Sequence, residues 1–246
     1  MARRLRTLWE VIEMKRVYFT TGIDTDIGKT VAVGLAARYL MRKGVSVITQ
    51  KLVQTGVDGD ISEDVAVHRR LMGISLTEDD LEGTTCPLIF KFPASPHLAA
   101  ERERRVVDVD LIDRATEKLL TQYDIILLEG AGGWHVPLTR DLLTSDYIAA
   151  RRYPTILVTS GRLGSVNHTL LTLESIRNNN VPLAGLVYNN YHEMNEIIRR
   201  DTLALFRDWL AQHTSRPRAI EEMPIVSKTD FLYSILDVNF SQIFDL

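Results

Sequence analysis

The chain has 246 residues, of which 45% are apolar and 25% are charged, and its formal net charge is −3. This length and composition fit one α/β domain of a globular protein. The slightly acidic balance predicts neither a nucleic-acid-binding nor a membrane-binding surface, and no apolar run reaches the roughly 18 residues that a membrane-spanning helix needs. The single cysteine, Cys86, excludes an intrachain disulfide and favours a reducing compartment, the cytoplasm.

The first thirteen residues differ from the rest of the chain. They are basic, with Arg3, Arg4 and Arg6, and they precede a second methionine, Met14. No apolar stretch of signal-peptide length follows the arginines. We therefore expect an N-terminal extension over 1–13, non-native or disordered, and a single domain over 14–246.

Short, continuous apolar runs alternate with helical patterns along the chain. Strands are expected at 17–20, 45–48, 125–128, 156–159 and 183–188. Helices are expected at 29–42, 61–72, 111–123, 166–177 and 194–211. This alternation predicts a three-layer α/β fold, with a mostly parallel sheet covered by helices on both faces. In such sheets the ligand binds at the carboxyl ends of the strands.

The first strand is followed by a glycine-bounded loop. Residues 21–30 read TGIDTDIGKT and lead directly into the first expected helix. A strand, this loop and a helix form the context of a phosphate-binding loop, in which Lys29 reaches the terminal phosphates and Thr30 ligates Mg²⁺. Backbone N–H groups and the helix N-terminus add positive partial charge. Five residues separate Gly22 from Gly28, one more than the general pattern has.

Three further polar residues lie near expected strand ends or helix starts. Glu129 follows the strand 125–128, and we favour a role in holding Mg²⁺ beside the phosphate loop over a solvated strand end. Lys51 either stabilises negative charge across the phosphates or is an exposed strand-end lysine. Asp64 is a possible second Mg²⁺ contact, although its position alone favours stabilisation of the first turn of a helix.

Five motifs in order resemble those of the dethiobiotin synthetase family. They are TGIDTDIGKT (21–30), QKLVQTG (50–56), ASPH (94–97), EGAGGW (129–134) and LGSVNH (163–168). The additional residue between Gly22 and Gly28 is typical of that family. The chain departs from it at Leu52, where proline is frequent, at Asp26, where glutamate is frequent, and at Thr55, where serine is frequent.

The resemblance implies an ATP-dependent ligase that forms the ureido ring of dethiobiotin. Its substrates are 7,8-diaminopelargonate, CO₂ or bicarbonate, and ATP with Mg²⁺. One amine takes up CO₂ as a carbamate, the carbamate attacks the γ-phosphate, and the second amine closes the ring and expels phosphate. The resemblance also implies a homodimer, and a three-layer P-loop NTPase fold whose mostly parallel sheet has about seven strands.

The resemblance assigns roles to residues of this sequence. The implied catalytic residues are Lys29, Lys51 and Thr25. The implied Mg²⁺ ligands are Thr30, Asp64 and Glu129. The implied ATP contacts are Asp26, Ile27, Gly28, Lys29, Thr30, Val31, Asp64, Glu129, Gly130, Ala131, Gly132, Asn189, Asn190, Pro224, Ile225 and Val226. The implied contacts to the diamine are Thr55, Ser95, Pro96, Gly164, Ser165, Val166, Asn167 and His168.

Two alternatives remain open. One is a nucleotide-dependent switch ATPase of the partition or cell-division type, which shares the loop and sheet architecture. Such ATPases usually carry an additional lysine early in the phosphate loop, and residues 22–27 contain none. The other is a paralogous carbamate-forming ligase that acts on a different diamine.

Overall fold

The computed structural model describes residues 16–192, 195–214, 219–225 and 238–244, so the expected extension at 1–13 lies outside the described residues. The elements in chain order are β1 (Arg16–Gly22), α2 (Lys29–Arg42), β2 (Val47–Lys51), β3 (Gln54–Thr55), α3 (Glu63–Met72), α4 (Glu78–Leu81), β4 (Ile89–Phe90), α5 (Pro96–Arg102), α6 (Val109–Gln122), β5 (Ile125–Gly133), α7 (Thr144–Arg151), β6 (Thr155–Ser160), α8 (Ser165–Asn178), β7 (Leu183–Asn189), the 3₁₀ helix η1 (Asn190–His192), α9 (Glu196–His213) and β8 (Ala219–Met223). No helix among these is both long and apolar enough to cross a membrane.

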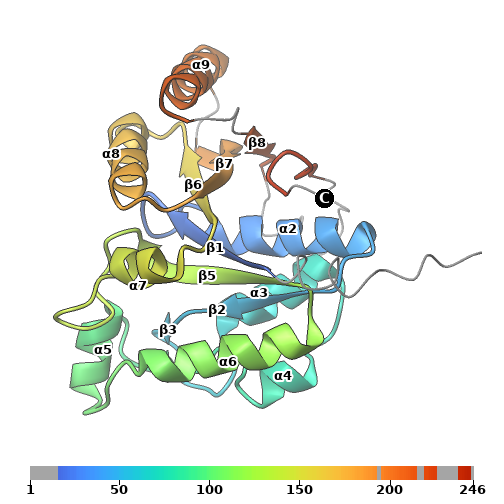
Figure 1. The fold of residues 1–246 in the computed structure, drawn as a ribbon, viewed down its shortest axis with the longest axis vertical. Helices are drawn as coiled ribbons and strands as arrows, with labels where there is room; N and C mark the ends of the chain where they lie inside the picture. Colours follow the sequence, from blue (N-terminus) through green and yellow to red (C-terminus); the bar gives the residue numbers. More distant parts are fainter. Residues whose placement is uncertain (1–15, 193–194, 215–218, 226–237, 245–246) are drawn as a thin grey trace, which may run out of the picture.

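One sheet organises the described part of the chain. Its six strands follow the order β2-β5-β1-β6-β7-β8, and every pair is parallel (Figure 1). Each strand and helix expected from the sequence is present, with bounds shifted by a few residues. The three-layer α/β fold is thereby confirmed, with six sheet strands in the described ranges where the family resemblance implies about seven.

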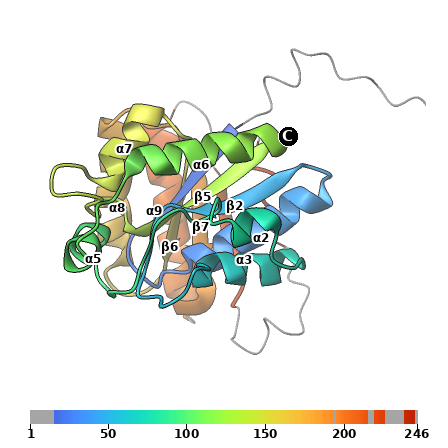
Figure 2. The same ribbon diagram turned by 90° about the horizontal axis from the view of Figure 1, so that it is seen from below.

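Helices cover both faces of the sheet, so the strands are apolar on both sides. Helices α2 and α3 pack on one face, and α6, α7, α8 and α9 pack on the other (Figures 1 and 2). Neighbouring residues of β1 show the division, because Tyr18 belongs to the α2 side of the core and Phe19 to the α6 side. Burial on both faces is why these strands are continuous rather than alternating apolar runs.

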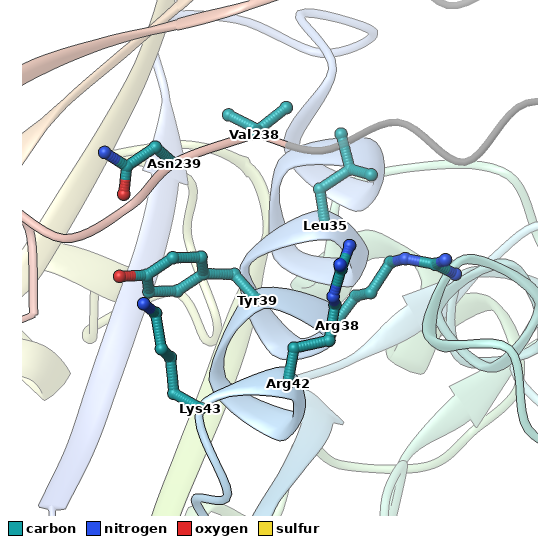
Figure 3. Close-up of a pocket in the computed structure, with 7 residues that line it drawn as sticks. All are labelled: Leu35, Arg38, Tyr39, Arg42, Lys43, Val238 and Asn239. Carbon is teal, nitrogen blue, oxygen red and sulfur yellow. The ribbon is translucent and has the colours of Figure 1, made fainter.

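The C-terminal segment 238–244 completes the core on the α2 side. The ring of Phe244 meets Tyr18 edge-on at a centroid distance of 5.0 Å, and Phe240 lies 6.0 Å from Tyr39. Next to this segment, the C-terminal half of α2 borders a pocket of about 440 Å³ (Figure 3). The pocket lies at the far end of α2 from the phosphate loop, and its charged lining comes from Arg38, Arg42 and Lys43.

Strand order and register bring distant polar residues together at one edge of the sheet. Strand β5 lies between β2 and β1, and Glu129 is in register with Lys51 of β2 and with Thr20 of β1. Both β2 and β5 extend further than the sequence predicts, to Lys51 and Gly133. Lys51 and Glu129, which the sequence places just beyond their strands, are therefore paired within the sheet. This pairing fixes their backbones beside the phosphate loop.

Helix α3 is fixed tightly against α2 and the sheet. A Cβ atom on Gly34 of α2 would lie only 2.6 Å from Cδ1 of Leu71, so glycine permits this close helix contact. On the other side of α3, the buried guanidinium of Arg69 donates to both carboxylate oxygens of Asp80 at 2.8 and 2.7 Å and to Thr49 Oγ1 at 2.7 Å. These contacts hold α3 in one position along the end of β2.

Candidate active site

The phosphate loop connects β1 to α2. Gly28 caps α2 with a φ of 102°, a left-handed conformation that favours glycine. A Cβ atom there would lie 2.5 Å from Nδ2 of Asn189 and 3.1 Å from Cε of Met223. Asn189 itself donates from Nδ2 to the carbonyl oxygen of Ile27 at 2.9 Å. The end of β7 therefore holds the loop in place and leaves no room for a side chain at Gly28.

Lys29 is the first residue of α2 and is largely buried. Its Nζ donates to the carbonyl oxygen of Asp24 at 2.9 Å, so the side chain is folded back over the loop. Burial lowers its pKa to about 8, and the nearby carboxylate of Glu129 only partly offsets that effect. The loop thus presents a poorly solvated ammonium group, for which an anionic phosphate is a suitable partner.

Three oxygen atoms from three different elements meet beside the loop. Thr30 Oγ1 lies 3.1 Å from Oδ1 of Asp64 on α3 and 3.0 Å from Oε1 of Glu129 on β5. Hydroxyl and carboxylate oxygens are the donors that Mg²⁺ prefers, and Mg²⁺ is commonly bound by one or two carboxylates plus phosphate and water oxygens. The chemistry of this donor set fits Mg²⁺ bound together with a nucleotide.

Lys51 completes the group from the end of β2. Its Nζ forms ion pairs with Asp64 and, at 2.8 Å, with Oε1 of Glu129, and it donates to the carbonyl oxygen of Gly130 at 3.2 Å. Burial alone would lower the pKa of Lys51, but the two carboxylates outweigh it and raise the pKa above its usual value. Burial likewise would raise the pKa of Glu129, but the positive charge of Lys51 holds it well below its usual value. Both groups are therefore charged.

These residues line one pocket of about 450 Å³. Its lining residues are Thr25, Asp26, Gly28, Lys29, Thr30, Val31, Lys51, Val53, Gln54, Thr55, Asp64, Glu129, Ala131 and Gly132. All three implied catalytic residues and all three implied Mg²⁺ ligands are among them, as is Thr55 from the implied diamine contacts. The sequence alone leaves Lys51 and Asp64 with either a role in the site or a purely structural role. The structure places both residues in the lining of this pocket.

The other implied nucleotide contacts lie outside the lining of the pocket: Ile27 in the phosphate loop, Gly130 in β5, and Asn189, Asn190, Pro224 and Ile225 at the ends of β7 and β8. Asn190 donates from Nδ2 to the carbonyl oxygen of Met223 at 3.0 Å, which joins the two strand ends. Pro224 and Ile225 follow β8 directly, with Ile225 about half exposed at 47%. Val226 lies outside the described residues.

Most of the implied diamine contacts also lie outside the pocket lining. Ser95 caps α5, and its hydroxyl lies 3.1 Å from Nδ1 of His97. Gly164 caps α8 with a φ of 94°, and nothing lies within 4 Å of where its Cβ would be. The neighbouring Leu163 is fully exposed, and Ser165 contacts Ser160 at 3.1 Å between their hydroxyl oxygens. Residues 163–164 and the exposed residues 167–168 in the first turn of α8 thus form an open surface on this chain, whereas Ser165 is buried.

Sequence reasoning missed two residues of the site, His68 behind the pocket and Gln54 in its lining. His68 is completely buried, and its Nε2 lies 2.7 Å from Oε2 of Glu129. Gln54 Oε1 accepts a hydrogen bond from the hydroxyl of Ser62, the residue that caps α3, at 2.6 Å. The spacing of four residues between Asp64 and His68 was the available signal, because it places both side chains on one face of a helix.

Known proteins are similar to this chain over most of its length. Residues 16–226 match the family described as an AAA domain. An ATP-dependent dethiobiotin synthetase BioD 2 of Pasteurella multocida is 47% identical over 87% of this chain and 100% of its own length. A protein of the same name from Haemophilus influenzae is 52% identical over 73% of this chain and 94% of its own length.

This chain belongs to the dethiobiotin synthetase family. The family resemblance in the five motifs is thereby confirmed, as is the prediction of an ATP-dependent enzyme of the synthetase type. Among solved structures, the MinC:MinD cell division complex of Aquifex aeolicus matches with a TM-score of 0.53 and 15% identity, over 88% of this chain and 84% of the matched one. At that identity the likeness concerns the fold alone, which dethiobiotin synthetase-like chains and such ATPases share.

Proposed function

We propose that the chain is an ATP- and Mg²⁺-dependent ligase that forms the ureido ring of dethiobiotin from 7,8-diaminopelargonate and CO₂. The observation that carries this proposal is the composition of one pocket. A phosphate loop with Lys29 and Thr30 faces a second lysine, Lys51, and two carboxylates, Asp64 and Glu129. A pocket built in this way can neutralise a triphosphate and a second anion at the same time.

The proposed reaction needs no nucleophile from the protein. One amine of the diamine adds to CO₂ and loses a proton, which gives a carbamate. A carbamate oxygen attacks the γ-phosphorus of ATP, and ADP leaves. The second amine attacks the carbonyl carbon of the resulting mixed anhydride, the carbon–oxygen bond to phosphate breaks, and the ring closes. Positioning and charge neutralisation are then the main tasks of the protein.

The residues of the pocket suit those tasks. The two carboxylates hold the ammonium group of Lys51 at the end of β2, where it can stabilise the carbamate and the transferred phosphoryl group. The ammonium group of Lys29 has three N–H donors, and one of them donates to the carbonyl oxygen of Asp24. The others can donate to the phosphates. Bound Mg²⁺, held by Thr30 and the carboxylates, would neutralise charge on the phosphate oxygens. The hydroxyls of Thr25 and Thr55 line the same space.

The adenine and the carboxylate tail of the diamine are assigned by family resemblance. Asn189, Asn190 and the segment after β8 would contact the base beside the phosphate loop. The partly exposed segment 163–168, which includes the start of α8, lies outside this chain's own pocket, which supports the proposal that it receives the tail of a diamine bound to a second copy in a homodimer. Backbone N–H groups at the start of α8 suit a carboxylate. We expect the enzyme to work in the cytoplasm, as a single domain over 14–246.

The proposal is tested by the substrate dependence of ADP release. ADP should form only when both 7,8-diaminopelargonate and bicarbonate are present with MgATP, in equal amount to dethiobiotin measured by mass spectrometry. Monoamines of the same length serve as matched controls, since they form a carbamate but cannot close the ring. ATP turnover that is indifferent to the diamine would favour a switch ATPase, and turnover only with a different diamine would favour a paralogous ligase.

A further inference from the structure

One buried contact of the site has no role in the reaction described so far. Glu129 uses its two carboxylate oxygens differently. Oε1 faces the pocket, 3.0 Å from Thr30 Oγ1 and 2.8 Å from Lys51 Nζ, whereas Oε2 faces away and lies 2.7 Å from Nε2 of His68. The 2.7 Å contact fits donation from the imidazole Nε2–H to this carboxylate oxygen, since an ionised carboxylate only accepts hydrogen bonds.

His68 does not touch the pocket itself. Its exposed fraction is 0%, it is absent from the pocket lining, and its other nitrogen, Nδ1, has no hydrogen-bond partner among the described residues. Burying a polar ring with one nitrogen unsatisfied costs free energy that an apolar residue would avoid. Among the described residues, the one polar contact of the ring is the contact to Glu129.

The fold fixes this imidazole as firmly as it fixes the strand end. His68 follows Asp64 by one turn of α3, so both side chains point from the same helix face toward β5. Close packing against α2 holds the backbone, because a Cβ atom on Gly34 would lie 3.3 Å from the Cα of His68. The next residue, Arg69, ties α3 to Asp80. The ring therefore cannot follow Glu129 if the carboxylate rotates.

We propose that His68 is a positioning residue that orients the carboxylate of Glu129 so that Oε1 points into the cation site. This inference rests on the proposed function, in which Glu129 holds Mg²⁺. Ligating carboxylates are commonly oriented by hydrogen bonds from groups behind them, and loss of such a partner typically weakens metal binding by about 10- to 100-fold. Helix α3 thus supplies one cation ligand, Asp64, and fixes the orientation of another.

The test measures cation binding directly. Mn²⁺ replaces Mg²⁺ as a paramagnetic probe, and free Mn²⁺ is counted by electron paramagnetic resonance in the presence of a non-hydrolysable ATP analogue. His68→Met and His68→Gln form a matched pair, because both side chains are unbranched and similar in length but only the amide can donate a hydrogen bond. His213→Leu on the exposed end of α9 is the control for loss of a histidine, and Glu129→Gln is the control for loss of the ligand.

We expect His68→Met to weaken Mn²⁺ binding by about 10- to 100-fold, His68→Gln to restore most of it, and His213→Leu to leave it unchanged. Thermal unfolding of each variant and affinity for the analogue without metal show whether the fold is retained, and His68→Leu is a second apolar replacement should the methionine variant not fold. Binding like that of the parent in both apolar variants, while Glu129→Gln loses Mn²⁺, would overturn the role of His68 alone. Unchanged Mn²⁺ binding in Glu129→Gln would overturn the cation site. It would also overturn the role of Mg²⁺ ligand that the proposed function gives to Glu129.

Discussion

Lys51 Nζ and Glu129 Oε1 lie 2.8 Å apart, although 78 residues separate the two in the chain. They meet because β2 and β5 are adjacent parallel strands and these two residues are in register at the strand ends. The contact places a buried ammonium group beside the phosphate loop, with its pKa raised by the carboxylates around it. The central claim of the site, that a second lysine stabilises a second anion, depends on this arrangement.

Removing the ammonium group should stop turnover. We expect Lys51→Ala to lower kcat by about 100-fold or more, the scale of a lost charge stabiliser, because Asp64 and Glu129 then face each other without the cation between them. The measurement is steady-state ADP release. Lys91→Ala is the matched control, since Lys91 pairs with Asp58 at the surface with its side chain 70% exposed. Normal turnover in Lys51→Ala would mean that this lysine has only a structural role at the end of β2.

Filling the space at Gly28 should disrupt the phosphate loop. A methyl group there would collide with the amide of Asn189, and the φ of 102° adds strain. We expect Gly28→Ala to lose affinity for ATP, measured with a fluorescent analogue. Gly44→Ala separates the two effects, because Gly44 has a φ of 79° but nothing within 4 Å of its Cβ position. The Gly44 variant should lose about 1 kcal/mol of stability from strain and keep its nucleotide affinity; equal loss of affinity in both variants would contradict the steric argument.

The buried ion pair between Arg69 and Asp80 should control stability at low pH. Burial alone would raise the pKa of Asp80, but hydrogen bonds from Arg69 and Thr85 outweigh it and hold the pKa below its ordinary value of 3.8. The stabilisation is therefore complete above about pH 4 and is lost as the pH falls through the lower pKa of the folded state. We expect Asp80→Asn to lose on the order of 3 kcal/mol of unfolding free energy near neutral pH, because Arg69 remains buried without its counter-ion.

The pH dependence provides the check on that prediction. Denaturant unfolding of the parent and of Asp80→Asn should give stabilities that converge as the pH falls below 3.8, since the parent then also loses the ionised carboxylate. Glu196→Gln is the control, because Glu196 pairs with Arg199 and Arg200 at the protein surface, and its loss should change stability little. A constant difference between parent and Asp80→Asn across this pH range would contradict the ionic explanation.

Much of the fold could be predicted from the sequence because its strands are buried on both faces. Continuous apolar runs at β1, β5, β6 and β7 and the loop before α2 carry strong local signals. The short strand β8, Ala219–Met223, contains two glutamates and is not predicted from the sequence, because its pairing with β7 rather than its own composition makes it a strand. The two-residue strands β3 and β4 have no sequence signal of their own.

Only those residues of the site that lie in a local sequence motif can be predicted from the sequence pattern alone. Lys29 and Thr30 follow from the loop, whereas the positions of Lys51 and Asp64 depend on strand order and helix packing, which act over long sequence distances. Their roles were suggested by family resemblance rather than by spacing. His68 lies in no motif, and its spacing of four residues from Asp64 shows only that the two side chains share a helix face. Its contact with Glu129 appears only when α3 packs against the end of β5.

Transfer of an oxygen atom from bicarbonate to phosphate tests the proposed chemistry most directly. In the proposed sequence, one oxygen derived from CO₂ attacks the γ-phosphorus and leaves with phosphate, while the other remains as the carbonyl oxygen of the ring. With ¹⁸O-labelled bicarbonate, unlabelled diamine and unlabelled MgATP, mass spectrometry should find one ¹⁸O atom in the released phosphate and one in the ureido carbonyl. Phosphate without ¹⁸O, formed together with ADP, would contradict the account, because it would mean that water and not a carbamate attacks ATP.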